Sequence, residues 1–323
     1  NPETAPWAKV FPKIHTSFLQ EIPFVKNHHQ FFGWLMPIAF ESFDFKEYDL
    51  VISVTSEAAK GIITNTNSKH ICYLLTPTRY LWSGYDMYFK NPLLRFISKP
   101  LVNYLKWWDK VAAQRPDKII AISTEVKNRI KKYYLRDSEI IFPPVDLDHK
   151  KILLDLNRGY YLYVGRLVKY KKIDLLVETF NDLGLPLVIV GTGSEEDNLK
   201  RKSKSNITLL GQISDEELTN IYMNAKAFLT PQEEDFGITS VEAQSFGVPV
   251  IAYGKGGSLD TVVDGKTGIL FNDQTKQSLS EAVKKFDTMS FNSGYLITNA
   301  KKFSKEIFKK EFSVQFNKIV KQI

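Results

Sequence analysis

Short runs of apolar residues, bounded by glycine, proline or polar residues, recur along the 323-residue chain. Nine of these runs are nearly continuous in hydrophobic residues: 49–54, 70–75, 118–123, 139–144, 160–165, 185–191, 206–211, 225–231 and 248–253. Continuous hydrophobicity, as opposed to alternation, is typical of strands covered on both faces of a parallel sheet. Each run therefore predicts a buried parallel strand.

Helical patterns lie between these runs, and the clearest occupy residues 172–184, 214–225 and 277–286. Ser214 followed by Glu217 predicts a capping box at the start of the second of these helices. Regular alternation of strand and helix predicts α/β units with parallel sheets.

The order of elements predicts two Rossmann-like domains followed by a terminal helix. We expect an N-terminal domain over 1–145, a second domain over 146–303 and an amphipathic helix over 304–323. The join falls in 142–159, where paired prolines favour an extended segment. Because residue 1 is Asn and not Met, we expect the first domain to be incomplete at its N-terminus.

Composition limits the class of protein. Hydrophobic residues make up 43% of the chain and charged residues 24%, which is ordinary for a globular protein. The single cysteine, Cys72, excludes a disulfide framework and indicates a buried thiol in a reducing compartment. The longest uncharged stretch near the start is too short to span a bilayer, so we expect a cytoplasmic protein.

The net charge of +7 is concentrated in one segment. Residues 90–136 hold 12 basic and 3 acidic residues, a net charge of +9, together with many aromatic residues. Such a helical segment is typical either of peripheral contact with an anionic membrane or of a solvated helix that packs its apolar side on the core. Nucleic acid is a third, less favoured partner.

Polar residues follow four consecutive predicted strands in the second half. Arg166 and Lys171 follow the first, Gly191 and Gly193 follow the second, "LGQIS" follows the third, and "TPQEEDFGITSVEA" follows the fourth. In open α/β sheets ligands bind at the carboxyl ends of the strands, so these groups predict one shared crevice.

Two glutamates, Glu234 and Glu242, flank the start of a helix predicted to begin after Gly237. At that spacing they could be an acid/base pair, a metal site or two hydroxyl-binding groups. The amide groups at a helix start favour phosphate, and Arg166 and Lys171 would add positive charge. A nucleoside diphosphate-sugar therefore fits best, with Glu242 binding a ribose diol and Glu234 a sugar hydroxyl.

Competing chemistries lack the necessary residues. All five histidines precede residue 150, so the second half has no histidine base or ligand. The "DLD" at 146–148 resembles a metal-binding Asp-x-Asp, but it lies in the join, so we expect no metal. No Gly-rich phosphate loop ending in Lys-Ser/Thr and no Gly-x-Ser-x-Gly is present.

Taken together, "VGRLVKYKKID", "VGTGSE", "LGQISDEEL", "EDFGITSVEAQSFGVPVIAYGKGG" and "GKTGILF" resemble the retaining glycosyltransferases of family 4, which have the two-domain GT-B fold. In the first half, "FESFDFKEYDLVIS", "ICYLLTPTRYLW" and "FPPVD" resemble a branch that includes GDP-mannose-dependent mannosyltransferases of O-antigen and exopolysaccharide assembly. The resemblance implies two parallel-sheet domains that face each other across a cleft.

The resemblance also implies a set of site residues. It implies catalytic roles for Glu234, Arg166 and Lys171, the last two gripping the donor diphosphate. The residues implied to bind the donor are Gly165, Gly191, Gly193, Gly211, Gln212, Ile213, Phe236, Gly237, Ile238, Thr239 and Glu242. It implies no metal or other cofactor, and a final helix that crosses back onto the first domain.

Acceptor contacts are expected from the first domain, where Arg79, Tyr80 and Trp82 follow the strand that ends at Leu75. Trp107 and Trp108 fit either the core or the acceptor and membrane side. The chain departs from the branch at Leu75, where relatives often have histidine, and it lacks the Gly-Gly loop expected after the first strand of the family.

The combined expectation is an enzyme that retains anomeric configuration while moving a hexose to a lipid-linked or growing saccharide, at the cytoplasmic face of the inner membrane. Mannose from GDP-mannose is the expected donor. Two alternatives stay open: a UDP-sugar-dependent transferase or epimerase on the same fold, and a nucleotide-sugar-binding protein with weak catalysis.

Overall fold

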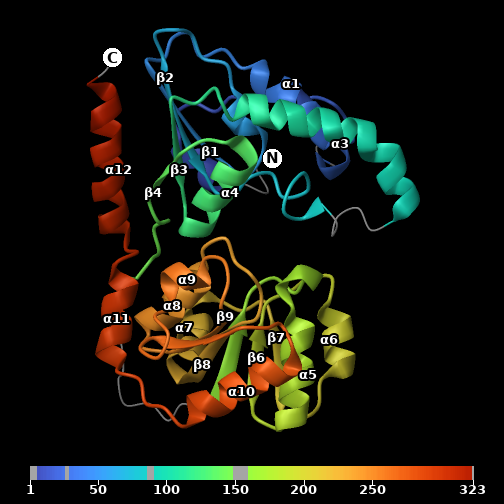
Figure 1. The fold of residues 1–323 in the computed structure, drawn as a ribbon, viewed down its shortest axis with the longest axis vertical. Coiled ribbons are helices and arrows are strands. Elements are labelled where there is room, and N and C mark those ends of the chain that lie inside the picture. Colours follow the sequence, from blue (N-terminus) through green and yellow to red (C-terminus); the bar gives the residue numbers. More distant parts are fainter. Residues whose placement is uncertain (1–5, 26–28, 86–90, 148–158, 322–323) are drawn as a thin grey trace. The chain divides into compact units, whose positions relative to one another are not determined.

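A computed structural model describes residues 6–25, 29–85, 91–147 and 159–321 (Figure 1). The chain forms two compact units. The first comprises Asn1–Ile122, Val126–Ile140 and Val314–Ile323, and the second comprises Ser123–Glu125 and Ile141–Ser313. The expected boundary lies a few residues later, after residue 145.

The first unit contains a four-stranded parallel sheet in the order β1-β2-β3-β4. Its strands are β1 (Leu50–Thr55), β2 (Lys69–Leu74), β3 (Lys118–Ala121) and β4 (Glu139–Ile140). Its helices and short 3-10 turns are η1 (Pro6–Val10), η2 (Phe18–Gln20), η3 (His29–Leu35), α1 (Met36–Glu41), η4 (Ala58–Gly61), α3 (Pro92–Ala112) and α4 (Thr124–Tyr134).

The second unit contains a six-stranded parallel sheet in the order β10-β9-β8-β5-β6-β7. Its strands are β5 (Tyr160–Val164), β6 (Leu187–Val190), β7 (Ile207–Gly211), β8 (Ala225–Thr230), β9 (Val250–Tyr253) and β10 (Gly268–Phe271). Its helices are η5 (Lys169–Lys171), α5 (Ile173–Leu183), α6 (Glu196–Lys202), α7 (Asp215–Asn224), α8 (Ile238–Ser245), α9 (Ser258–Thr261), α10 (Lys276–Asp287) and α11 (Ser293–Lys301).

All nine strands predicted from continuous hydrophobicity are confirmed, and both sheets are parallel. The capping box of α7 is also confirmed, since Ser214 Oγ accepts from Glu217 N and the Glu217 side chain accepts from Ser214 N. Strand β10 was not predicted, because its apolar run is only three residues long.

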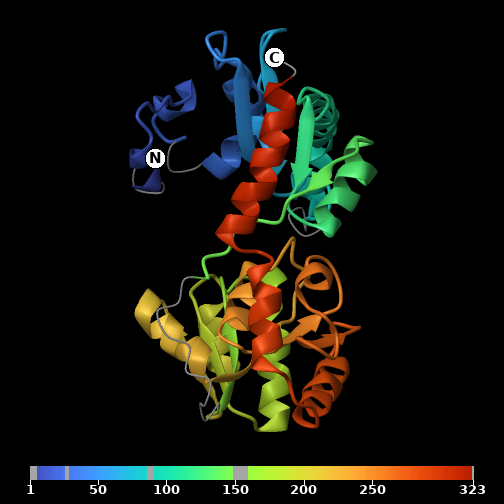
Figure 2. The same cartoon turned by 90° about the vertical axis from the view of Figure 1, so that its left-hand side faces the viewer.

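The second sheet is covered on both faces, which explains its continuous hydrophobic strands (Figure 1 and Figure 2). Along β5, Tyr161 and Tyr163 belong to a core that includes residues of α5 and α10. Leu162, between them, belongs to a second core that includes residues of α7 and α8. Alternate side chains of one strand therefore fill the two faces.

In the first sheet, the edge strand β1 is buried on one face only. In β1, Val51 and Ser53 are buried, whereas Ile52 and Val54 are exposed on the opposite face. Cys72 on the neighbouring β2 is a buried free thiol, as expected, and burial raises its pKa to about 11.

Beneath α3, the first unit buries an ion pair that the sequence did not reveal. Lys60 Nζ lies 2.5 Å from Asp109 Oδ1. The Asp109 carboxylate also accepts hydrogen bonds from the Thr78 hydroxyl (2.9 Å), Trp82 Nε1 (2.7 Å) and the Tyr134 hydroxyl (2.7 Å). Lys60 Nζ also donates to Glu57 O at 2.6 Å, so each charge has more than one partner, as a buried pair requires.

The C-terminal helix α12 (Lys305–Val320) begins in the second unit, and its residues from Val314 onward belong to the first. Lys118 Nζ and Gln315 Oε1 are 2.5 Å apart. Of the predicted join, residues 148–158 lie outside the described residues. Val145, just before them, donates a backbone hydrogen bond to Phe303 O (2.9 Å). No helix within the described ranges is both long and apolar enough to cross a membrane.

Candidate active site

The four strand ends that the sequence singled out are neighbours in the second sheet, because β8, β5, β6 and β7 are adjacent and parallel. The chain leaves β5 towards β6 on one side and returns as β8 on the other. This reversal is the topological switch point, where loops diverge and open a crevice in α/β sheets. The groups that follow β5 and β8 therefore meet at one place.

An ion pair links those two loops. Lys171 Nζ, after β5, lies 2.5 Å from Glu234 Oε1, after β8. Gln232 Nε2 donates to the same carboxylate oxygen at 2.5 Å. The side chains of Lys171 and Glu234 are 15% and 14% exposed, so the pair is shielded but still reached by solvent.

Two buried polar atoms beside this pair lack a partner among the described residues: Tyr163 Oη and Gln232 Oε1. Burial raises the pKa of Tyr163, and the charge of Glu234 adds to the effect. Unpaired buried polar atoms are rare in folded proteins, and beside an ion pair at a strand end they are candidates for ligand contact. Neither residue was predicted from the sequence, since a Tyr on a strand and a lone Gln carry no recognisable pattern.

Arg166 is exposed, and its Nη2 donates to the Tyr170 hydroxyl at 2.6 Å. Its charge acts on Tyr163, as does that of Glu234. Arg166 and Glu234 thus both act on one buried hydroxyl, and Lys171 pairs with Glu234, so the structure brings together all three predicted catalytic residues.

The predicted helix start is also present. Gly237 has a φ of +99° and immediately precedes α8, which begins at Ile238, and no side chain caps this helix start. A left-handed backbone explains the glycine. The Phe236 ring is buried, with its centroid 5.7 Å from that of Phe142 and 5.3 Å from that of Phe303. Only the backbone of this residue is therefore available to a ligand, whereas Ile238 is exposed and Thr239 half-buried.

Glu242 lies one turn further along α8 and is half-buried. Its Oε2 accepts a hydrogen bond from the buried Tyr222 hydroxyl at 3.1 Å. Burial raises the pKa of Glu242, and the charges of Asp146 and Asp215 raise it further, while the hydrogen bond from Tyr222 opposes the shift. Tyr222 thus fixes the carboxylate, a role that no sequence pattern indicated.

Several glycines allow the loops at this edge to pack closely. A Cβ on Gly191 would lie 2.0 Å from Gly165 O, and one on Gly193 would lie 2.3 Å from Leu167 O. Close packing of the loops is thus enough to explain why glycine stands at positions 191 and 193. Contact of Gly191 and Gly193 with a donor stays a prediction.

Gly256 and Gly257 were not assigned a role from the sequence. A Cβ on Gly256 would lie 2.4 Å from Glu234 O, and one on Gly257 would lie 2.3 Å from Phe236 Cα. Gly257 N also donates to Glu234 O at 2.8 Å. These two glycines hold the loop that carries Glu234, and "GKGG" in the motif was the available signal.

At the end of β7, Gly211 has a φ of +67° with open space beside it, and Gln212 is exposed. Ile213 packs partly against the core near Tyr222. Their position at the same sheet edge fits the implied contact with the donor, which stays a prediction.

The predicted acceptor residues lie in the first unit and are considered there by themselves. Trp82 stacks on Tyr133, with centroids 5.0 Å apart, and its Nε1 donates to Asp109. Arg79 and Tyr80 are half-buried beside it. Trp82 is therefore held by the core network, and an acceptor role for these residues stays a prediction.

Within the described residues, no group of three or more His, Cys, Asp or Glu side chains is placed to hold a metal ion. Asp146, the first aspartate of the "DLD" segment, forms an ion pair with Lys305. Metal-independent chemistry stays a prediction.

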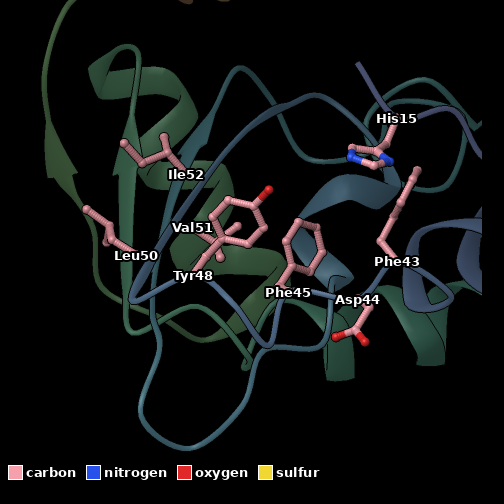
Figure 3. A pocket seen from close by; sticks show the side chains of 8 residues that line it. All are labelled: His15, Phe43, Asp44, Phe45, Tyr48, Leu50, Val51 and Ile52. Atoms are coloured by element: carbon pink, nitrogen blue, oxygen red, sulfur yellow. The ribbon is translucent and has the colours of Figure 1, made fainter. Parts of the chain in front are cut away.

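A separate pocket of about 410 Å³ lies in the first unit (Figure 3). Its lining residues are His15, Phe43, Asp44, Phe45, Tyr48, Leu50, Val51 and Ile52. It lies at the amino end of β1, whereas α/β sheets bind ligands at the carboxyl ends of their strands. We assign it no part in the active site.

Comparison with known proteins agrees with this site. Residues 144–303 match the family described as "Glycosyl transferases group 1". This stretch contains every predicted catalytic and donor-binding residue. The chain therefore carries a group 1 glycosyl transferase domain.

Three curated relatives are similar over longer stretches. The capsular polysaccharide biosynthesis glycosyltransferase CapM of Staphylococcus aureus is 28% identical over 66% of this chain and 65% of its own. The alpha-1,3/1,6-mannosyltransferase ALG2 of Dictyostelium discoideum is 32% identical over 56% and 48%. The O-antigen chain mannosyltransferase C of Escherichia coli is 24% identical over 68% and 62%. The chain spans less than two thirds of the length of each.

Two solved structures share the fold. Sucrose-phosphate synthase from Thermosynechococcus elongatus has a TM-score of 0.68 over 95% of this chain and 80% of its own, at 17% identity. Anabaena HepE, solved with UDP and glucose, has a TM-score of 0.62 over 94% and 84%, at 16% identity. The two parallel sheets are those of the GT-B fold, as the sequence predicted.

Proposed function

We propose that this chain contains the catalytic site of a retaining glycosyltransferase. It would transfer a hexose from a nucleoside diphosphate to a lipid-linked or growing saccharide, with mannose from GDP-mannose as the donor. The observation that supports this most is the Lys171–Glu234 ion pair at the switch point, beside the uncapped start of α8.

The proposed reaction breaks the bond between the hexose C1 and the donor phosphate oxygen, and the electron pair leaves with the nucleoside diphosphate. The acceptor oxygen bonds to C1 on the same face, and its proton passes to the departing phosphate oxygen. Negative charge thus grows on the diphosphate. Fixed donors aimed at developing charge are the largest catalytic term in many enzymes, and here they are Arg166, Lys171 and the α8 amides.

The two glutamates then have separate tasks. Glu234, fixed by Lys171 and Gln232, accepts hydrogen bonds from hexose hydroxyls. Glu242, fixed by Tyr222, accepts them from the ribose. The partly satisfied cluster around Tyr163 Oη would be completed by the donor.

Mannose is favoured because two of the curated relatives are named mannosyltransferases. UDP-sugars form the second candidate donor class, favoured by the UDP in the HepE structure. With a lipid-linked acceptor, we also propose that the enzyme acts at the cytoplasmic face of the inner membrane.

The test compares Glu234→Gln with Glu233→Gln, which removes the adjacent, exposed carboxylate. Transfer from GDP-mannose to octyl α-mannoside is measured by mass spectrometry of the product. We expect Glu234→Gln to lower the rate by about a hundredfold or more, and Glu233→Gln to change it by less than about threefold.

Thermal shift with GDP-mannose and UDP-glucose measures binding of the donor independently of transfer activity. A ligand at a hundred times its dissociation constant stabilises the fold by about 2.7 kcal/mol. Stabilisation by UDP-glucose alone would overturn the choice of donor. An absence of stabilisation by either, together with unchanged turnover of Glu234→Gln, would overturn the function.

A further inference from the structure

Helix α3 (Pro92–Ala112) has two apolar faces, and folding uses only one of them. Val102, Leu105, Trp108 and Ala112 are buried. Trp108 also donates its Nε1 hydrogen to Glu41 at 2.8 Å. Burial of this inward face holds the helix against the rest of the first unit.

The outward face carries a continuous row of large hydrophobic side chains. The exposed residues, which we call the α3 stripe, are Leu93, Phe96, Ile97, Leu101, Tyr104, Trp107 and Val111. Positions 93, 97, 101, 104, 107 and 111 follow the three- and four-residue spacing that places side chains on one face of a helix. Phe96 is 77% exposed and Trp107 is 61% exposed.

Such a stripe is unusual on a folded surface. Scattered exposed hydrophobic residues are normal, but contiguous apolar rows of this size indicate a site of contact. Its aromatic members include Tyr104 and Trp107, whose ring centroids are 6.1 Å apart. Amphipathic aromatic rings are typical of the boundary between the apolar and polar parts of a bilayer.

The exposed charges of α3 are all positive. They belong to Arg95, Lys99 and Lys110, whereas Lys106 is half-buried. The one acidic residue of the helix, Asp109, is buried against Lys60. An apolar row flanked by cations is the pattern of helices that lie in the plane of an anionic membrane.

A second copy of the chain fits this face poorly. In a two-fold symmetric contact the same patch meets itself. The cations of one α3 would then face those of the other, and like charges facing each other oppose association. Anionic lipid headgroups complement both the charge and the apolar row.

We propose that the α3 stripe and its flanking cations form a docking surface for an anionic lipid bilayer. The apolar side chains enter the headgroup region and the lysines contact lipid phosphates. This proposal concerns the first unit alone, and it does not depend on which sugar the second unit binds.

The test is cosedimentation of the whole chain with vesicles of phosphatidylcholine alone and with equimolar phosphatidylglycerol. We expect binding only to the anionic vesicles, and weaker binding at high salt, because salt screens charges at the surface. Lys99→Glu/Lys110→Glu should weaken binding by about tenfold or more. The matched control is Lys284→Glu/Lys285→Glu, which changes the same charge on exposed positions of α10 and should leave binding within about twofold.

Trp107→Ser tests the apolar part, with circular dichroism melting to verify that the fold is intact. We expect binding to anionic vesicles to fall severalfold. Unchanged binding in both α3 variants would overturn the proposal. So would a dimer, seen by light scattering, that Trp107→Ser abolishes while no vesicle binding is detected, because the stripe would then belong to a second copy.

Discussion

Two lysine–carboxylate pairs, one in each unit, have the same geometry and different surroundings. Lys60 Nζ lies 2.5 Å from Asp109 Oδ1, and Lys171 Nζ lies 2.5 Å from Glu234 Oε1. The side chains of the first pair are 0% and 1% exposed, those of the second 15% and 14%.

The difference lies in what completes each network. Around Asp109, hydroxyl and indole donors from Thr78, Trp82 and Tyr134 satisfy the carboxylate. Around Glu234, the neighbouring Tyr163 Oη and Gln232 Oε1 lack partners in the described part of the chain. A closed network contributes to stability, whereas an open one at a strand end is poised to receive a ligand.

The largest expected effect is on stability, from breaking the closed pair. Lys60→Met leaves the Asp109 charge buried without its cation, so we expect the free energy of unfolding to fall by about 3–5 kcal/mol. All five tryptophans precede residue 141, so urea unfolding followed by tryptophan fluorescence reports on the first unit. Unfolding of Lys171→Met, whose substitution lies in the second unit, is followed by far-UV circular dichroism. A loss of stability there equal to that in Lys60→Met would remove the contrast between the two pairs.

A second buried group of the first unit should make its stability depend on pH. His70 Nε2 is 2.8 Å from Ser53 Oγ, and burial lowers the pKa of His70 to about 4 from its usual 6.5. As pH falls, the unfolded chain binds this proton before the folded one. The stabilisation is therefore complete above pH 6.5 and is lost between pH 6.5 and 4, by about 3 kcal/mol.

Urea unfolding at both ends of that pH window measures this loss. In His70→Gln the fall in the free energy of unfolding over that window should be smaller by about 3 kcal/mol, which is the contribution of the histidine. A pH dependence identical to that of the unsubstituted chain would show that other groups cause it.

The smallest expected effect comes from opening the ligand-facing pair. Lys171→Met should weaken binding of GDP-mannose by about 10- to 100-fold, because a hydrogen bond to a charged group contributes about 1.5–3 kcal/mol. Its effect on unfolding should stay below about 1 kcal/mol, since the pair is reached by solvent. Calorimetric titration measures the affinity, with Lys169→Met, exposed in the same 3-10 turn, as the control. Equal affinities of the two variants would contradict the assignment.

The fold could be predicted largely because its signals are local. Continuous hydrophobicity marked nine strands, and the start of α8 after Gly237 followed from a glycine before a helical pattern. Parallel strands share one carboxyl edge, so the order of the motifs was enough to bring Arg166, Lys171 and Glu234 together.

Tertiary structure decided what depends on residues distant in sequence. It showed that Tyr222 holds Glu242 and that Gly256 and Gly257 lie against the loop of Glu234. Trp107 and Trp108 are adjacent and chemically identical, yet one is 61% exposed and the other 6%. The packing of α3 against Ala58 and its neighbours turns Trp108 inward and leaves Trp107 outward.

The sequence by itself thus determined the type of sheet, the edge that carries the site and the residues that could contact a ligand. Whether a charge such as Asp109 or Glu234 serves stability or chemistry was decided by packing. Burial and hydrogen-bond satisfaction arise from contacts between distant segments, and these exist only in the folded chain.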